Sequence, residues 1–344
     1  MRHHTRRFAQ EWGRGLGMAL LFFALSGCAL VGPNYQPPEI PAPKGWQASL
    51  EGGLAAEAPD AELLARWWEV FGDPLLTRLE ERAVGGNLDV KAAVARVREA
   101  RALRRGSRAG RAPRVDLAAS AVKSRSSADS SFGMETEIYD VGFDAGWEVD
   151  LFGAVRRRIE AAEAELAASR EGMRAVLVTL AGEVAREYLE IRTLQARLAA
   201  LRRNVDLLRQ VYDYTLDRYR AGLVDELAVA RSRGDLEQTR ARIPQLEIAL
   251  AAAKNRLAVL MGEPPGGLET ELREARPLPA IPATVAVGVP ADMLRRRPDI
   301  RRAERQLAAQ TARIGMATAD LYPRLRLAGS IGLEALRPED LPQW

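Results

Sequence analysis

The strongest constraint on the fold is a run of apolar residues that repeats with helical spacing from Val155 to Tyr219. The apolar positions lie three or four residues apart throughout, which is the period of one face of an α-helix. A continuous helix of this length would extend about 100 Å at ~1.5 Å per residue, too long for a globular domain. Because its other face is charged, such a helix must pack side by side with others, in a coiled coil or an α-barrel.

A short segment of small and apolar residues ends this pattern. A glycine there lets the chain reverse, and Asp225 can cap a returning helix that runs to about Met261 and bends at Pro244. The pattern therefore predicts a long helical hairpin over residues 153–261. The residues of the reversal are Ala221, Gly222, Leu223 and Val224.

An internal repeat adds a second constraint. Residues 89–120 align without a gap on residues 299–330, an offset of 210, with nine of the 32 positions identical. The shared Pro-Arg-x-x-Leu-Ala-x-Ser that follows the helix favours duplication over chance similarity between two helices rich in Ala and Arg. A complete second copy would reach about residue 471, so we expect the second copy to be C-terminally truncated here. An open reading frame continuing past Trp344 would test this expectation.

The clearest strand signal is a strict alternation of apolar with acidic or small residues. Such an apolar face can pack on a soluble core or face lipid. We favour a barrel strand with lipid outside and water inside, since the neighbouring helices carry little aromatic bulk and the stretch can cross a membrane when tilted. A strand from residue 113 would complete a β-hairpin over residues 113–151, and residues 324–334 would form an unpaired strand. The apolar face consists of Tyr139, Val141, Phe143, Ala145, Trp147, Val149 and Leu151.

The first 27 residues are typical of a secretion signal, with a basic start and a short apolar run from Met18 to Leu25. The run is too short to span a bilayer. Its ending, Leu-Ser-Gly-Cys, resembles the lipobox of bacterial lipoproteins, which implies cleavage before Cys28 and acylation of its thiol. The alternative is an ordinary signal peptide with an incidental cysteine.

The chemistry of the mature chain is limited. Both histidines, His3 and His4, lie in the segment predicted to be removed, and Cys28 is the only cysteine. We therefore expect no enzyme activity, no metal site and no cofactor. The net charge is only +4, so no nucleic-acid partner is indicated. Carboxylate pairs such as Glu80 with Glu81 lie among arginines at helical spacing, which favours solvated helix faces over a catalytic pair.

Together these features resemble the TolC-type outer-membrane efflux proteins, in particular the lipoprotein branch with nodulation-T-like members. The resemblance implies a homotrimer in which each chain gives strands to a shared transmembrane β-barrel and long helical hairpins to a periplasmic α-barrel. The fold class would be an α+β membrane protein with internal duplication. The matching stretches are Trp67–Trp68 with Phe71–Leu75, Tyr139–Gly153, Tyr219–Val224, Asn255–Gly262 and Arg297–Glu304.

The resemblance also implies a function. The protein would be the passive exit duct of a tripartite efflux system, lipid-anchored in the cell outer membrane and extending into the periplasm. An inner-membrane pump would supply the energy, and a periplasmic adaptor would dock at the hairpin tip of residues 221–224. For that tip, the alternative is a glycine that only reverses the helix.

The predicted organisation is a signal peptide at 1–27, a lipid-anchored tether rich in Pro and Gly at 28–60, a first repeat at 61–265, and a linker with an incomplete second repeat at 266–344. Two other functions remain open, a structural coiled-coil lipoprotein of the outer membrane and a truncated form without function. A spacer needs no lipid-facing sheet, so the alternating strand argues against the first. We do not expect the 344-residue form alone to make a working pore.

Overall fold

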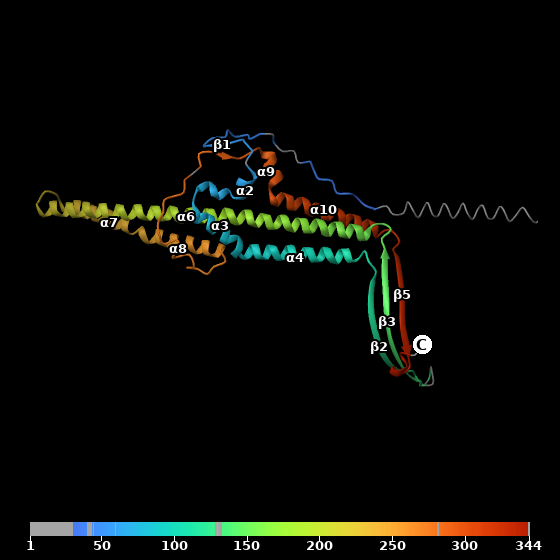
Figure 1. Cartoon of the computed structure of the whole chain (residues 1–344). Helices are drawn as coiled ribbons and strands as arrows, with labels where there is room; N and C mark the ends of the chain where they lie inside the picture. The colour runs from blue at the N-terminus through green and yellow to red at the C-terminus, as the bar shows by residue number, and fades with distance from the viewer. Residues whose placement is uncertain are drawn as a thin grey trace, which may run out of the picture. The chain divides into compact units, whose positions relative to one another are not determined.

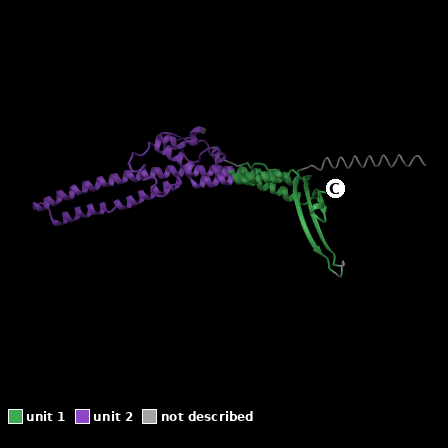
Figure 2. Cartoon of the chain, turned by 60° about the horizontal axis from the view of Figure 1, so that its bottom comes forward, with its two compact units in different colours: residues 1–39, 98–169, 302–344 green, residues 40–97, 170–301 purple. Residues whose placement is uncertain are grey.

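The computed structural model describes residues 30–342, apart from residues 40–42, 44, 59, 128, 130–132 and 281. The predicted signal peptide and Cys28 lie outside the described residues. The chain divides into two compact units, shown in Figure 2. The sheet unit comprises residues 1–39, 98–169 and 302–344, and the hairpin unit comprises residues 40–97 and 170–301.

Long helices dominate the structure, and the strands are few (Figure 1). None of the described helices has both the length and the apolar character that a membrane-spanning helix requires. In chain order the elements are β1 (Leu54–Ala55), α2 (Ala61–Ala65), the 3₁₀ helix η1 (Trp67–Phe71), α3 (Pro74–Gly86), α4 (Leu88–Ala109), β2 (Arg114–Arg125), β3 (Glu135–Val149), α6 (Ala154–Arg220), α7 (Glu226–Arg240), α8 (Ile243–Leu260), β4 (Val285–Ala286), α9 (Pro290–Arg296), α10 (Pro298–Ala319), β5 (Leu325–Ala335) and the 3₁₀ helix η2 (Pro338–Asp340).

The long helix and its return follow the sequence pattern closely. Helix α6 is continuous over 67 residues, and Asp225 Oδ1 accepts a hydrogen bond from Ala228 N at 2.9 Å as the cap of α7. The return consists of two helices, because the chain turns at Ala241 and Arg242. Pro244 occupies the first turn of α8, where its missing N–H removes no helical hydrogen bond. The predicted interruption near this proline is therefore present.

Two polar caps and a close glycine contact fix the ends of α3 in the hairpin unit. Asp73 Oδ1 accepts from the amides of Leu75 and Leu76 at the start of α3. Asn87 Oδ1 caps α4 in the same way, and its Nδ2 donates to Leu260 O at 2.9 Å. Between the two helices, a Cβ atom on Gly86 would lie 2.0 Å from the main-chain oxygen of Met261, so only glycine allows the end of α8 to approach this closely.

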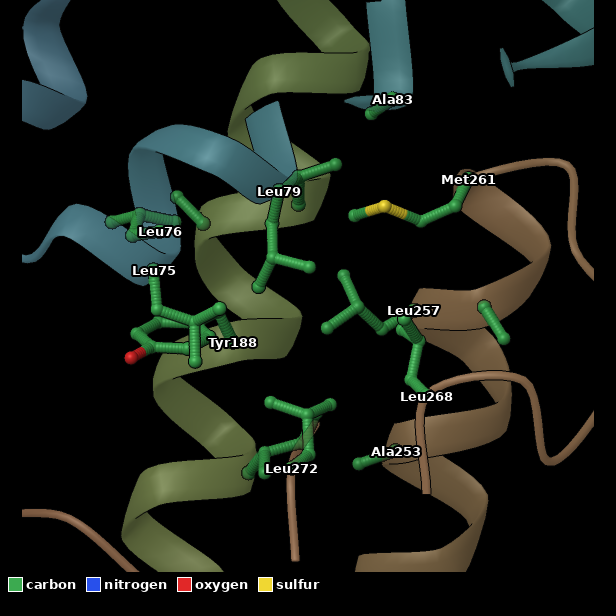
Figure 3. Packing of buried hydrophobic residues seen from close by; sticks show 14 of the residues in the cluster. Leu75, Leu76, Leu79, Ala83, Tyr188, Ala253, Leu257, Met261, Leu268 and Leu272 are labelled. Atoms are coloured by element: carbon green, nitrogen blue, oxygen red, sulfur yellow. The ribbon is translucent and has the colours of Figure 1, made fainter. Parts of the chain in front are cut away.

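The core of the hairpin unit lies between α3, α6, α8 and the segment after α8. Leucines of α3 point towards Tyr188 of α6 and towards the apolar side chains of α8, as Figure 3 shows. Leu268 and Leu272 close the cluster from the segment that follows α8. Such burial is the main favourable contribution to folding. The central members are Leu75, Leu76, Leu79, Ala83, Val184, Tyr188, Ile191, Ala253, Leu257, Ala258, Met261, Leu268 and Leu272.

The predicted tether and linker contain structure that the sequence pattern does not indicate. β1 pairs in parallel with β4, with Leu54 opposite Val285. Val285 N donates to Gly53 O at 2.8 Å, and Trp46 Nε1 donates to Gly288 O at 2.8 Å. Strands of two residues have no readable periodicity, which explains why this pairing was missed.

The sheet unit contains an antiparallel sheet of three strands in the order β2-β3-β5. β2 pairs with β3 from Arg114 opposite Gly146 to Arg125 opposite Glu135. On its other side β3 pairs with β5, the strand of the second repeat. The expectation that this strand is unpaired was wrong, because β3 offers it a second edge of main-chain N–H and C=O groups. Helices α4 and α10 each have 22 residues and keep the offset of 210 between the repeats. The internal duplication thus comprises a helix followed by a strand.

Candidate functional site

One face of the sheet is a continuous and exposed apolar surface. The register aligns Leu117, Phe143 and Ile331 in one row across the three strands. These side chains are 66%, 52% and 71% exposed. An apolar surface that runs across a whole sheet and has no cover marks a contact with a protein or with a membrane.

Six of the seven residues predicted for this face lie on it. Tyr139, Val141, Phe143, Ala145, Trp147 and Val149 alternate along β3 with the opposite face. Leu151 was predicted as the last member, but it lies beyond the strand, in the bend after Val149. The reason is Asp150, whose carboxylate accepts from Val155 N at 2.9 Å and Arg156 N at 3.0 Å and so turns the chain into α6.

The apolar face is bounded by groups suited to a membrane interface. Trp147 near one end donates from Nε1 to Arg111 O at 3.1 Å. Beyond Tyr139 at the other end, Lys123 forms ion pairs with Glu135 and Glu137 at 3.2 and 2.6 Å. From Tyr139 to Trp147 the strand covers about 20 Å of height at ~3.3 Å per residue and a tilt of ~40°. That is close to the apolar band of about 25 Å found on outer-membrane barrels.

The opposite face of the sheet is polar and rich in glycine. Arg114 pairs with Asp116 at 2.8 Å, and the guanidinium of Arg326 lies over Gly146, where a Cβ would be 3.3 Å from its Nη2. These side chains and Asp144 line a shallow polar hollow. Acidic groups outnumber basic ones on this face, which therefore suits contact with water. Its charged residues are Arg114, Asp116, Asp140, Asp144, Glu148, Arg326 and Glu334.

The sheet also has two open edges. β2 and β5 each pair with β3 only, and neither has a second neighbour among the described strands. An open edge presents unpaired N–H and C=O groups, which are strongly unfavourable in hydrocarbon.

The predicted tip residues 221–224 lie at the reversal between α6 and α7. Gly222 has a φ of 72°, a left-handed conformation that favours glycine, and its N–H donates to Tyr219 O at 2.8 Å. Leu223 is 64% exposed, and Tyr214, Tyr219 and Leu227 near it are also exposed. The tip thus exposes apolar side chains as well as reversing the chain.

A buried polar network, which the sequence pattern did not reveal, lies within the hairpin unit. The Tyr188 hydroxyl donates to Asp73 Oδ2 and accepts from Arg192 Nε at 3.1 Å. Arg192 Nη1 in turn donates to Gln195 Oε1 and to Glu274 O, both at 2.8 Å. The network links the start of α3, the middle of α6 and the segment after α8.

Two pKa values in this unit are perturbed in opposite directions. Burial by itself raises the pKa of Asp73, but hydrogen bonds from Tyr188 and from the Leu75 and Leu76 amides outweigh it, so the pKa is lowered. Burial raises the pKa of Glu80 to about 8. The expectation that Glu80 is part of a solvated face was wrong, because its side chain is 1% exposed. Glu80 follows Leu76 by four residues, so its position on the buried face of α3 was readable from the sequence.

No group of three or more metal-ligating side chains occurs in the part of the chain that the structure describes. The amphipathic sheet presents one apolar and one polar face, and the hairpin tip exposes apolar side chains.

An amphipathic sheet with open edges and a long helical hairpin define the fold of a TolC-type outer-membrane channel subunit. The family model described as outer membrane efflux protein matches residues 79–263. Nodulation protein T of Rhizobium leguminosarum bv. trifolii is 36% identical over 313 residues, which are 90% of this chain and 66% of that protein. The solvent efflux pump outer membrane protein SrpC of Pseudomonas putida is 36% identical over 318 residues, 90% of this chain and 66% of that protein.

A solved structure supports the same family assignment. The outer-membrane channel OprN superimposes with a TM-score of 0.83 at 36% identity, over 91% of this chain and 70% of that one. The chain therefore belongs to the outer membrane efflux protein family. It spans slightly less than two thirds of the length of the two similar nodulation proteins T, 66% and 64%.

Proposed function

We propose that this chain is the outer-membrane channel component of a tripartite efflux system and acts as a passive exit duct for small molecules. The observation that carries the proposal is the sheet β2-β3-β5, which is apolar and exposed on one face and acidic and glycine-rich on the other. A barrel wall between lipid and a water-filled lumen needs this distribution.

The open edges of β2 and β5 support a homotrimer. A single sheet of this kind is unstable in lipid, because its edge groups find no partner there. Pairing the edges of one subunit with those of the next closes the barrel and satisfies these groups. The same closure places the acidic faces of all subunits around one lumen, in contact with water, and their apolar faces against outer-membrane lipid.

The exposed tip supports a periplasmic adaptor as the second partner. Leu223 and its neighbours Tyr219 and Leu227 offer an apolar contact at the end of the helical hairpin. The left-handed glycine Gly222 keeps this end compact. In the proposed assembly an adaptor contacts the residues 221–224 and joins the duct to an inner-membrane pump, which supplies the energy.

The proposed location is the cell outer membrane, with the helices in the periplasm and acyl groups on Cys28 as an additional anchor. The relatives do not select one cargo, since their names refer to solvents, toluene and pyoverdine. We therefore propose small molecules as a class, and no single compound, as the cargo. The channel itself performs no chemistry, so cargo passes down its own gradient.

Planar-bilayer recording tests whether the protein forms a conducting channel. Protein expressed from the complete open reading frame is extracted from the outer membrane, its oligomeric state is measured by native mass spectrometry, and its conductance is recorded. We expect a trimer with stable ionic conductance. A membrane-inserted trimer without conductance would favour a structural lipoprotein, and a monomer confined to the soluble fraction would contradict the membrane assignment as well.

A further inference from the structure

A buried arginine at the start of α6 holds a segment that lies over a hundred residues earlier in the sequence. The Arg157 side chain is 1% exposed. Its Nε donates to Val31 O at 3.1 Å, and its Nη2 donates to Gly32 O at 3.0 Å and Asn34 Oδ1 at 2.9 Å. The remaining contact is an ion pair from Nη1 to Glu160 at 2.8 Å. Three of the four acceptors thus belong to residues 31–34.

Further contacts hold this segment, which we call the clamped segment (residues 30–35). Val31 N donates to Phe152 O at 3.3 Å, and the Tyr35 hydroxyl donates to Glu304 Oε1 at 3.3 Å. A Cβ atom on Gly32 would lie 2.5 Å from the Cα of Gly315 in α10. The clamped segment is therefore packed between the start of α6 and α10.

Gly315 lies against both Gly32 and Arg157. A Cβ on this residue would also lie 2.7 Å from Nε of Arg157. The absence of a side chain at this position of α10 therefore makes room for the guanidinium and for Gly32 at once. A buried guanidinium without its acceptors is strongly unfavourable, so Arg157 stabilises the bound position of the clamped segment.

The clamped segment lies at one end of the sheet. Phe152, whose main chain holds Val31, follows the last residue of β3 by three positions, and its ring stacks on Tyr322 at 4.6 Å, just before β5. Leu30 packs here too, since a Cβ on Gly153 would lie 2.4 Å from its Cδ1. Cys28 precedes Leu30 by two residues, so their Cα atoms are at most about 7 Å apart.

We propose that Arg157 is a positioning residue for the lipid anchor: its guanidinium fixes the clamped segment at the sheet end, so that acyl chains on Cys28 enter the membrane where β3 ends. The inference rests on the proposed function, in which Cys28 is acylated and the sheet crosses the outer membrane. Holding the anchor at this level aligns the apolar face of the sheet with the hydrocarbon layer and limits sliding of the subunit along the membrane normal.

Chymotrypsin provides a direct test, because cleavage after Tyr35 separates the anchor peptide from the rest of the chain. Full-length protein in detergent is digested, and the fragment that begins at Gln36 is followed by mass spectrometry. Arg157→Gln should accelerate this cleavage by more than about tenfold, because opening no longer breaks hydrogen bonds from the guanidinium. The matched control is Arg158→Gln, which removes the same charge from an exposed neighbour on α6 and should leave the rate within about twofold of wild type.

A second variant separates positioning from stability of the helix. Asn34→Ala removes one acceptor from the clamped segment and leaves α6 unchanged, and it should accelerate cleavage in the same direction by a smaller factor. Cleavage at the exposed Tyr214 should keep its rate in every variant. If Arg157→Gln reduces the helical circular dichroism signal, Asn34→Ala decides, and an unchanged rate in that variant overturns the proposal.

Labelling with radioactive palmitate tests whether Cys28 carries an acyl chain. Wild type should carry the label, and chymotrypsin should release it with the peptide that ends at Tyr35. An unchanged cleavage rate in Arg157→Gln with intact helices overturns the positioning role and leaves the proposed function untouched. A wild-type protein without palmitate overturns the anchor and this inference together, while the conductance of the channel remains a separate test.

Discussion

Removing the hydroxyl group of Tyr188 should loosen the start of α3 and make it sensitive to acid. In Tyr188→Phe the Asp73 carboxylate loses a donor and the buried Arg192 Nε loses its acceptor. Each lost hydrogen bond to a charged group corresponds to about 1.5 to 3 kcal/mol, and water can reach only part of the site, so we expect a loss of about 3 kcal/mol in local stability. That would raise the population of the open state by roughly a factor of 100.

The pH dependence follows from the sign of the Asp73 shift. Its folded pKa is lowered, so the contribution of its carboxylate to stability is present above the unfolded pKa and is lost as the pH falls through the folded pKa. Without the tyrosine donor the pKa of Asp73 should rise, because burial then opposes ionisation with less compensation. The acid transition of the variant should therefore begin at a higher pH than that of wild type.

Hydrogen-exchange mass spectrometry measures both effects on peptides that cover the start of α3, where Asp73 caps the amides of Leu75 and Leu76. Tyr214→Phe is the matched control, since that tyrosine is on the same helix and 65% exposed. Protection of α3 in Tyr188→Phe equal to that in Tyr214→Phe, at neutral and at acid pH, would show that the Tyr188 hydroxyl does not stabilise the start of α3.

Three further changes test other parts of the structure. Leu117→Arg places a cation on the apolar face, at about 2 to 4 kcal/mol near the middle of the membrane, and should reduce the fraction of protein assembled in the outer membrane, whereas Ala118→Arg on the polar face should assemble. Equal assembly of the two variants would contradict the orientation of the sheet. Glu80→Gln should remove a loss of stability that wild type shows at alkaline pH. A carboxyl whose folded pKa is raised to about 8 stabilises the fold below its unfolded pKa and loses this contribution as the pH rises through 8. Thermal melts at pH 6 and 9 measure this loss, and parallel pH profiles for variant and wild type would speak against it. Gly86→Ala should lower the melting temperature by several degrees, since its Cβ would lie 2.0 Å from the main-chain oxygen of Met261. Gly85→Ala is the control, because a Cβ there meets open space and should leave the melting temperature unchanged. Similar melting temperatures for the two variants would disprove the close approach of α8 to Gly86.

The parts of the fold that repeat a local period could be predicted from the sequence. The spacing from Val155 to Tyr219 predicts both ends of α6 to within a residue, because a helix with one apolar face has apolar residues every three or four positions. The caps Asp73, Asn87 and Asp225 were also readable, since a polar residue before an apolar run has a local cause.

Contacts between distant segments could not be predicted in this way. Arg157 and Arg192 look like ordinary charged positions in a helix rich in arginine, and only the chain segments packed against them make them buried. Alternation alone also carried the predicted strand too far, because Asp150 continues the pattern while its carboxylate already caps α6. The pairing of β1 with β4 depends on main-chain groups and leaves no side-chain pattern at all.

Nitroxide accessibility at two neighbouring residues of β3 shows whether the sheet separates lipid from water. Spin labels are placed at position 143 or 144 by Phe143→Cys or Asp144→Cys in protein reconstituted in lipid vesicles. We expect the label at position 143 to collide mainly with oxygen dissolved in the hydrocarbon, and the label at position 144 to collide mainly with a water-soluble nickel complex. Equal access of the nickel complex to both labels would show that the sheet does not separate lipid from water.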